Sequence, residues 1–342
     1  MEMKANYGIF FASKNNYDLL ENWLLNYIDY VPTGINILNL DLGSCESQKI
    51  RGKQICEKYN LIFIKARKTE FQDNIHQIFE ELNIIEINNL LYLHQDCFPI
   101  DKNTFLKINL IPEEYDIENH GLIGFNIYHD IEISKIDILN KYMTTSRAVL
   151  QKGNGYYMSH PKGSRVNYDN FIENKPFVVE NIMWTAMLLN KKSFLKNINI
   201  DLRFNFFLAA DDMAYQYLSK NIFNVVFPNI RFKHDQNIKT KFSLPKDSPL
   251  GKKEDIIIRY GRTDHHIIWN QKWGFKYDVS KVFNLYNNKI IKKFFITFFP
   301  KFYSNLETIG RISFSNKENK LGYMNLFYKH DPANGPLRYI KK

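Results

Sequence analysis

Hydrophobic and polar residues alternate in blocks over most of this sequence, and the blocks predict strands and helices in turn. Short apolar runs that end in polar residues are typical of buried strands, and apolar residues at every third or fourth position indicate a helix. The predicted strands are 7–11, 35–40, 61–64, 90–93, 122–125 and 183–189, and the predicted helices are 20–27, 44–59, 71–85 and 192–198. This alternation predicts an α/β fold with a mostly parallel, Rossmann-like sheet and right-handed crossovers.

Polar residues that follow the predicted strands mark the sheet edge where a ligand would bind. In sheets of this kind, ligands lie beyond the carboxyl ends of the strands. The strand at 90–93 is followed by His94, Gln95 and Asp96, so Asp96 is placed to take part in chemistry. A lone Asp after a strand is also a common start of a turn, and this alternative stays open for Asp96 taken alone. Two further polar residues end early strands, namely Ser13 and Asp41.

An acidic pair and a histidine come later in the chain. Apolar residues from 213 to 218 fall on one helical face, so Asp211 and Asp212 stand in the first turn, where the helix dipole favours carboxylates. On that ground alone, capping explains one Asp, and the pair is not unusual. Extended pieces are predicted at 224–227 and 230–234, and the second ends at His234, which by itself is more simply a packed or surface residue. The order of strand-end Asp, acidic helix start and strand-end His is what points to a site.

Three later stretches invite two interpretations each. Residues 141–176 lack periodicity but contain aromatic and arginine side chains, which predicts a functional loop at the acceptor site, with a disordered excursion as the alternative. The aromatic and basic residues at 269–274 either close over an acceptor or pack on the surface. Residues 290–299 either lie on an anionic membrane or form a core helix. The length of 342 residues predicts a large domain at 1–245 and a smaller C-terminal extension at 246–342, expected to be helical.

Composition, charge and missing motifs argue against several classes of protein. The net charge of +10 favours anionic partners, but no Lys/Arg block, zinc-finger spacing or RNA-binding aromatic motif accompanies it, so we expect no nucleic-acid partner. No Gly-x-Gly-x-x-Gly or Walker loop follows a strand, which argues against dinucleotide oxidoreductases and phosphate-loop NTPases. Three cysteines give no disulfide framework, and neither a signal peptide nor an apolar window of about 18 residues is found, so we expect a cytoplasmic protein.

The order of these motifs resembles the GT-A glycosyltransferases, and specifically a bacterial family-2-like group with His-Gln-Asp at the end of the fourth strand. The matching run is Leu91-Tyr92-Leu93-His94-Gln95-Asp96. The likeness extends through 183–192 and through 201–212, which ends in the acidic pair, to His234. Asp96 stands where the Asp-x-Asp motif of the family has its last carboxylate. His94 replaces the first carboxylate, which is a departure from that motif.

The resemblance implies a divalent cation and a general base. Asp96 would ligate Mg²⁺ or Mn²⁺, with His234 and His94 as further ligands, and nitrogen ligands suit Mn²⁺ better than Mg²⁺. The cation would neutralise the charge that grows on the leaving diphosphate. The acceptor hydroxyl needs a base, for which Asp211 or Asp212 would serve, with Asp211 favoured by motif position.

The resemblance also implies residues that hold the nucleotide-sugar donor. These expected donor contacts are Ser13, Asp41, Asn74, Gln95 and Asp96. Helix capping is an alternative role for Ser13 and for Asn74.

The function implied is transfer of a hexose-like sugar from a UDP-, GDP-, CDP- or TDP-linked donor to a bacterial surface glycan under assembly, such as a capsule or lipooligosaccharide. Inversion, addition of single sugars, and a glycan or lipid-linked glycan acceptor are expected, with peripheral contact to the inner membrane as one option. A carbohydrate-binding or scaffold protein on a degenerate GT-A fold is the alternative of another class. A transferase of another nucleotide-activated group is a third interpretation.

Overall fold

The computed structural model describes residues 5–68, 72–84, 87–129, 155–156, 176–179, 181–182, 185–204, 209–220, 222–235, 237–238, 242 and 265–273. The predictions made for 141–176 lie outside these residues except at 155–156 and 176, and those made for 290–299 lie outside them entirely. Most of the predicted extension at 246–342 is also outside them. The boundary predicted at 245 therefore stays a prediction.

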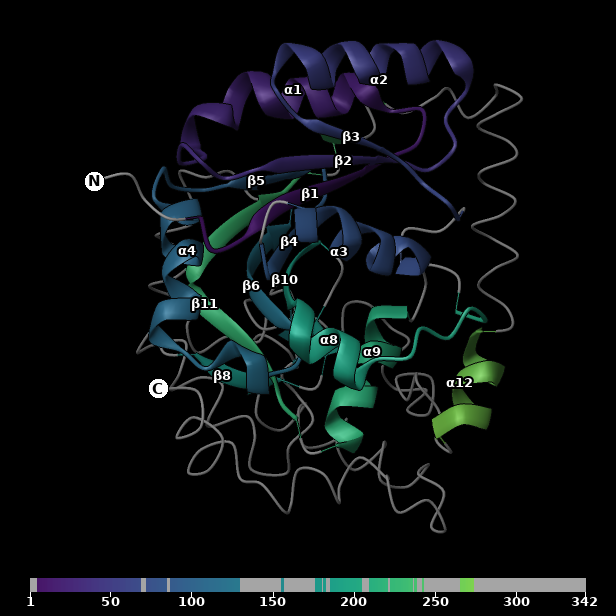
Figure 1. Cartoon of the computed structure of the whole chain (residues 1–342). Coiled ribbons are helices and arrows are strands. Elements are labelled where there is room, and N and C mark those ends of the chain that lie inside the picture. Colours follow the sequence, from purple (N-terminus) through teal and green to yellow (C-terminus); the bar gives the residue numbers. More distant parts are fainter. Residues whose placement is uncertain are drawn as a thin grey trace, which may run out of the picture.

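The elements follow the predicted alternation closely (Figure 1). The strands are β1 Gly8–Ser13, β2 Ile37–Asp41, β3 Ile62–Lys65, β4 Asn89–Leu93, β5 Cys97–Pro99, β6 Ile123–His129, β7 Gly155–Tyr156, β8 Phe177–Val179, β9 Asn181–Ile182, β10 Ala186–Asn190 and β11 Asn224–His234. The α-helices are α1 Tyr17–Tyr27, α2 Glu46–Lys58, α3 Ile75–Ile84, α4 Thr104–Glu114, α8 Lys191–Asn197, α9 Ala209–Ser219 and α12 His265–Trp273. Short 3-10 helices are η1 Ile28–Tyr30, η2 Gln72–Asn74 and η3 Ile117–Asn119.

One mixed sheet organises the described residues. Its strand order is β3-β2-β1-β4-β10-β6-β11-β5, with β8 also paired to β11. Strands β3, β2, β1 and β4 are parallel, and β10 runs antiparallel to both β4 and β6, so β6 and its parallel neighbour β11 point the same way as β4. The mostly parallel α/β sheet predicted from the sequence is thus confirmed. The carboxyl ends of β1, β2 and β4 meet at a common edge.

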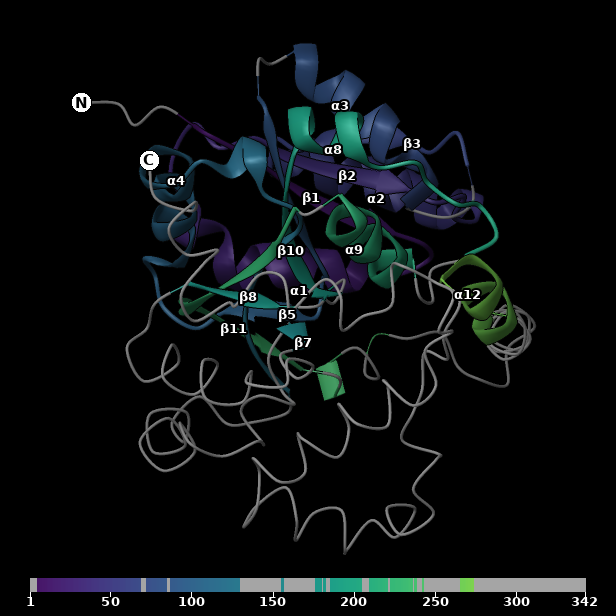
Figure 2. The ribbon, with the colours of Figure 1, turned by 90° about the horizontal axis from the view of Figure 1, so that it is seen from below.

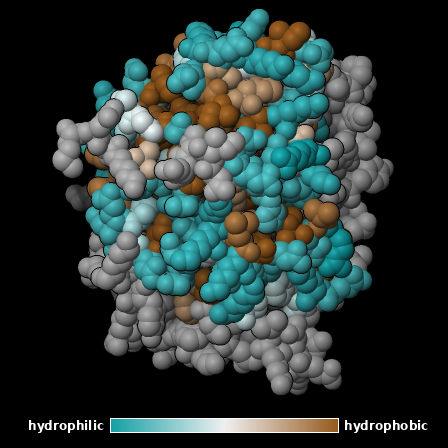
Figure 3. All heavy atoms as spheres, viewed as in Figure 1, coloured by the Kyte–Doolittle hydropathy of each residue, from teal (hydrophilic) through white to brown (hydrophobic). Residues whose placement is uncertain are grey.

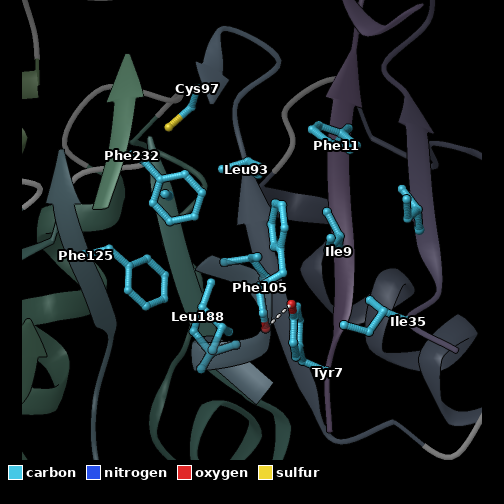
Figure 4. Packing of buried hydrophobic residues seen from close by; sticks show 14 of the residues in the cluster. Tyr7, Ile9, Phe11, Ile35, Leu93, Cys97, Phe105, Phe125, Leu188 and Phe232 are labelled. Atoms are coloured by element: carbon cyan, nitrogen blue, oxygen red, sulfur yellow. Dashed lines mark hydrogen bonds between the residues drawn. The ribbon is translucent and has the colours of Figure 1, made fainter. Parts of the chain in front are cut away.

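Helices cover both faces of the sheet because successive strand residues point to opposite sides. In β1, Ile9 and Phe11 join one hydrophobic core and Phe10 joins the other. Helices α1 and α2 lie over one face and α3 over the other (Figures 1 and 2). Figure 4 shows the core on the α1 side, where the Tyr7 hydroxyl donates to the carbonyl of Phe105 at 3.0 Å. Two packed layers against one sheet hold the strand ends in place.

Two parts of the fold differ from the sequence prediction. Strand β5 and helix α4 were not predicted. Strand β5 has three residues. The α4 sequence is apolar on several sides and carries Pro112 in its last turn. The two extended pieces predicted at 224–227 and 230–234 form a single strand, β11, whose register with β6 shifts between Phe227 and Arg231. Pro228 lies within that shift, where it cannot donate to the ladder.

The face seen in Figure 3 is largely hydrophilic, with hydrophobic residues showing between the polar ones. The exposed large hydrophobic side chains of the described residues are Leu25, Ile50, Leu106, Leu110, Leu195 and Leu202. Such exposure is ordinary for a surface in contact with water. Among the described residues, no helix has the length and apolar composition required to cross a bilayer.

Buried His120 is expected to make the stability of the fold depend on pH. The side chain is 4% exposed, and neither ring nitrogen has a hydrogen-bond partner among the described residues. Burial lowers its pKa from 6.5 to about 4, against a smaller opposing effect of Asp116. Below about pH 6.5, His120 binds a proton in the unfolded chain but stays neutral in the folded chain. The free energy of unfolding therefore falls as the pH drops toward 4.

We expect the free energy of unfolding to fall by about 2 kcal/mol between pH 7 and pH 5 because of His120. His120→Gln removes the titrating group, so urea unfolding of this variant should lack that part of the loss. His76→Gln, at an exposed histidine of α3, is the matched control and should behave as the wild type. An unchanged pH dependence in His120→Gln would contradict the assignment.

Candidate functional site

A tight turn after β4 places the first candidate residues. The strand ends at Leu93, after which the N–H of His94 donates to the carbonyl of Thr185 and the N–H of Cys97 donates to the carbonyl of His94, both at 3.0 Å. The N–H of Asp235 donates to the carbonyl of Asp96 at 2.9 Å, which holds the end of β11 against the turn. Residues that are about 140 positions apart in the chain are thereby brought to one place.

The three predicted metal ligands come together at this point. One ligand atom from each of His94, Asp96 and His234 lies within 4.8 Å of the other two. Nε2 of His234 is 3.2 Å from Oδ2 of Asp96, and Nδ1 of His94 is 3.5 Å from Oδ1. The two imidazole rings are nearly perpendicular, with centroids 6.0 Å apart. Two nitrogens and a carboxylate facing one point form a donor set suited to a divalent transition metal.

The state of Asp96 fits a cation. Asp96 is 2% exposed, and its two oxygens lie beside ring nitrogens, with Oδ2 3.2 Å from Nε2 of His234 and Oδ1 3.5 Å from Nδ1 of His94. A buried oxygen of this kind is costly unless a cation or a donor satisfies it. Burial acts to raise the pKa of Asp96, but hydrogen bonds and charge from His234 and His94 outweigh it and hold the pKa well below its ordinary value. Asp96 is therefore a carboxylate at neutral pH.

Ser13 and Gln95 meet beside the candidate metal ligands. The Ser13 hydroxyl donates to Oδ1 of Asn39 at 2.5 Å, and the Gln95 amide donates to the same hydroxyl. Oε1 of Gln95 is buried without a hydrogen bond among the described residues. Because Gln95 lies between His94 and Asp96 in the chain, this network joins the end of β1 to these two candidate metal ligands.

Asp41 lies at the end of β2, directly paired with Ser13 in the sheet register. Its Oδ1 accepts from the Tyr17 hydroxyl at 3.1 Å and from the N–H of Ser44 at 3.2 Å. Oδ2 is buried and has no hydrogen bond within the described ranges. Asp41 and Gln95 thus each offer an acceptor oxygen, as a ribose hydroxyl or a base N–H would require.

Tyr17 reaches Asp41 because Gly52 of α2 leaves it room. A Cβ at Gly52 would lie 2.3 Å from the Tyr17 ring. Burial and the neighbouring Asp41 carboxylate raise the pKa of Tyr17, so its hydroxyl stays a donor. The packing of α1 on α2 therefore sets one hydrogen bond at the edge of the sheet.

Asn74 shapes a loop. Its Oδ1 accepts from the N–H groups of Arg67 at 3.0 Å and Lys68 at 2.9 Å, and its amide donates to the carbonyl of Lys68 at 3.1 Å. These contacts fix the two cationic residues just after β3. The expected contact of Asn74 with a nucleotide base stays a prediction.

The acidic pair lies in the first turn of α9, as predicted. Asp211 is half-buried, whereas Asp212 is 2% exposed. Asp212 accepts from the Trp273 indole at 2.9 Å and from the Gln216 amide at 2.8 Å, and the Lys272 ammonium lies 2.8 Å from both of its oxygens. Burial raises the pKa of Asp212, against the opposing effect of Lys272.

Residues Asn39, Tyr17 and Lys272 hold the candidate site residues and were not among the predicted site residues. Asn39 could have been recognised from the sequence, because it is a polar residue inside an apolar strand and shares a strand face with Asp41. Tyr17 could not be recognised from the sequence, because it lies in helix α1 and its partner Asp41 lies on strand β2. Lys272 was noted in an aromatic and basic cluster, but its pairing with Asp212 spans 60 positions.

Comparisons with known proteins give structural neighbours alone. No protein-family model matches the chain, and no curated protein matches its sequence. Solved structures similar to it include GalNAc-T7 with UDP, GalNAc and Mn²⁺, at 9% identity and a TM-score of 0.47 over 69% of this chain and 44% of that one. A second is the mannosyltransferase PcManGT from Pyrobaculum calidifontis with GDP-Man and Mn²⁺, at 9% identity and a TM-score of 0.39 over 68% of this chain and 57% of that one.

A third neighbour is TarS 1-349 from S. aureus in complex with UDP-GlcNAc, at 14% identity and a TM-score of 0.39. The alignment covers 68% of this chain and 58% of that one. The chain thus spans about half of the length of the solved structures named here.

Proposed function

We propose that this chain is a metal-dependent glycosyltransferase of GT-A fold. It moves a sugar from a nucleotide-sugar donor to a growing bacterial surface glycan, such as a capsule or lipooligosaccharide. The observation that carries the proposal is the cluster of His94, Asp96 and His234 at the carboxyl edge of the sheet. Asp41 and Gln95, each with a buried acceptor oxygen, lie at the same edge.

The residues at this edge of the sheet suit both the nucleoside and the diphosphate of a nucleotide-sugar donor. Asp41 and Gln95 accept hydrogen bonds from the nucleoside, and the Ser13 hydroxyl holds Gln95 in place. His94, Asp96 and His234 would hold a divalent cation, which would supply charge neutralisation for the diphosphate. The net charge of +10 adds a general attraction for an anionic donor.

Transfer requires that one carboxylate take a proton. The acceptor oxygen forms a bond to the anomeric carbon, the bond from that carbon to the diphosphate oxygen breaks, and the acceptor proton passes to the base. We assign the base to Asp211 by its motif position in the His-Gln-Asp resemblance. The oxygens of Asp212 accept from Gln216, Lys272 and Trp273. Direct displacement inverts the anomeric configuration, and inversion and a surface-glycan acceptor rest on the His-Gln-Asp resemblance.

A non-catalytic carbohydrate-binding protein is the second candidate, and the replacement of an acidic residue by His94 favours it. Such a protein would release no nucleoside diphosphate from any donor, even at high protein concentration. It would also bind glycan without metal.

A thermal-shift screen of UDP, GDP, CDP and TDP, each with and without Mn²⁺, tests the proposed function. A ligand that binds the native state stabilises it by about 2.7 kcal/mol at a hundredfold excess over Kd. We expect one nucleotide to raise the melting temperature with Mn²⁺ and to do so less without it. A shift with none of the four would contradict the proposal for these donor classes.

The two imidazoles among the candidate metal ligands predict a preference for Mn²⁺ over Mg²⁺. Mg²⁺ favours oxygen ligands and retains its waters, whereas imidazole binds transition metals. In electron paramagnetic resonance titrations of free Mn²⁺, we expect one site on the wild type, competed weakly by Mg²⁺. His234→Ala should weaken Mn²⁺ binding at least about tenfold. His76→Ala, at an exposed histidine, should bind as the wild type, and equal affinity in His234→Ala would contradict the ligand assignment.

A further inference from the structure

Helix α12 contacts the acidic helix α9 through a lysine that bridges two carboxylates. The Lys272 ammonium lies 2.8 Å from the Asp212 carboxylate and 3.1 Å from Oδ2 of Asp201. Asp201 is also paired with Arg203 at 2.7 Å. The charges of the two aspartates are balanced by those of Lys272 and Arg203. The counter-ion of the buried Asp212 is Lys272, which belongs to another helix. Losing that counter-ion would leave a buried carboxylate uncompensated.

Aromatic packing holds the same helix in place. Trp269 is fully buried and lies edge-on to Tyr215 of α9, with ring centroids 5.0 Å apart. Trp273 is 5% exposed, and its centroid lies 5.6 Å from that of Tyr215. The Lys272 ammonium lies 5.6 Å from the centroid of the Phe204 ring. These contacts make α12 part of the core cluster on that face of the sheet.

The contacts lie on both sides of the start of α9. Asp201 and Phe204 precede the helix, whereas Asp212 and Tyr215 lie in its first two turns. Asp211 is the neighbour of the residue that α12 holds most tightly. We therefore expect a change in the Asp212 contacts to move the backbone that carries Asp211.

We propose that Lys272 and Trp273 of α12 are positioning residues that hold the first turn of α9, and with it Asp211, in the geometry needed for proton transfer. This inference rests on the proposed function for its catalytic part. Lys272 and Trp273 act through Asp212, to which both donate. Their loss should therefore lower kcat and leave the KM for the donor unchanged.

The test compares Lys272→Met with the wild type as full-length chains. Hydrogen exchange followed by mass spectrometry should show faster exchange in the peptide that covers the start of α9, with α3 unchanged. Nucleoside diphosphate release from UDP-, GDP-, CDP- and TDP-sugars with Mn²⁺ should show kcat lowered at least about tenfold and the donor KM within twofold of the wild type. Lys272→Arg, which keeps the charge, should recover part of kcat.

Lys192→Met is the matched control, because Lys192 pairs with Glu118 at an exposed site of α8. It should leave both readouts unchanged. If Lys272→Met does not fold, Trp273→Phe removes one hydrogen bond and keeps the ring, and the same two results are expected. Unchanged exchange at α9, or a wild-type kcat, overturns the inference. Failure of the wild type to release diphosphate overturns the proposed function, while the exchange result still decides whether α12 holds α9.

Discussion

Asp96→Asn is expected to lower Mn²⁺-dependent turnover of the nucleotide-sugar donor by about a thousandfold or more. A bound cation contributes several kcal/mol of charge stabilisation in the transition state, and each 1.36 kcal/mol is a factor of ten in rate. Asp96 provides the carboxylate of the cluster, and its buried Oδ2 lies 3.2 Å from Nε2 of His234. Asn keeps the shape of the side chain but loses the charge. The measurement is kcat for nucleoside diphosphate release at saturating Mn²⁺.

Two controls separate loss of the metal from loss of the fold. The circular dichroism spectrum of Asp96→Asn should match that of the wild type. Asp29→Asn, which changes an exposed Asp in η1, should keep the wild-type rate. If Asp96→Asn turned over donor at the wild-type rate with Mn²⁺, the metal assignment would fail.

Asp211→Asn is expected to lower transfer by about a hundredfold to ten-thousandfold, which is the usual contribution of a general base. Nucleotide and Mn²⁺ binding should persist, because Asp211 lies in the first turn of α9 and the metal ligands lie at the ends of β4 and β11. The comparison of kcat with donor affinity separates these effects. Binding is measured by the thermal shift with the nucleotide that stabilises the wild type.

Asp18→Asn is the control for the helix dipole. Asp18 lies in the first turn of α1, as Asp211 does in α9, but it is exposed on the far side of the sheet from the α9 core. Its loss should leave kcat unchanged. If Asp211→Asn kept the wild-type kcat and Asp212→Asn did not, the base would be Asp212.

Local patterns in the sequence predicted the sheet and the strand end that carries His94 and Asp96, and the family resemblance supplied their role as metal ligands. Apolar runs that end in polar residues gave the strand ends, and in a parallel sheet those ends meet at one edge. His94 and Asp96 were therefore readable beside one strand. The family resemblance added His234, whose position after another strand is brought against Asp96 by a backbone hydrogen bond from Asp235.

The remaining parts depend on contacts between distant segments. The pairing of Lys272 with Asp212 joins residues 60 positions apart, and no local period encodes it. The Tyr17 contact with Asp41 depends on the absence of a side chain at Gly52, in a third element. Helix α4 was missed because its apolar residues do not fall on a single face. The donor sugar and the acceptor depend on loop shapes of the same non-local kind.

Release of nucleoside diphosphate by the full-length chain tests the central claim most directly. UDP-, GDP-, CDP- and TDP-sugars would be incubated with the protein in Mn²⁺, and in EDTA as the metal-free control. We predict that one nucleotide class is turned over with Mn²⁺ and that EDTA abolishes the turnover. Equal turnover in EDTA, or no turnover of any of the four in Mn²⁺ at high protein concentration, would contradict a metal-dependent glycosyltransferase.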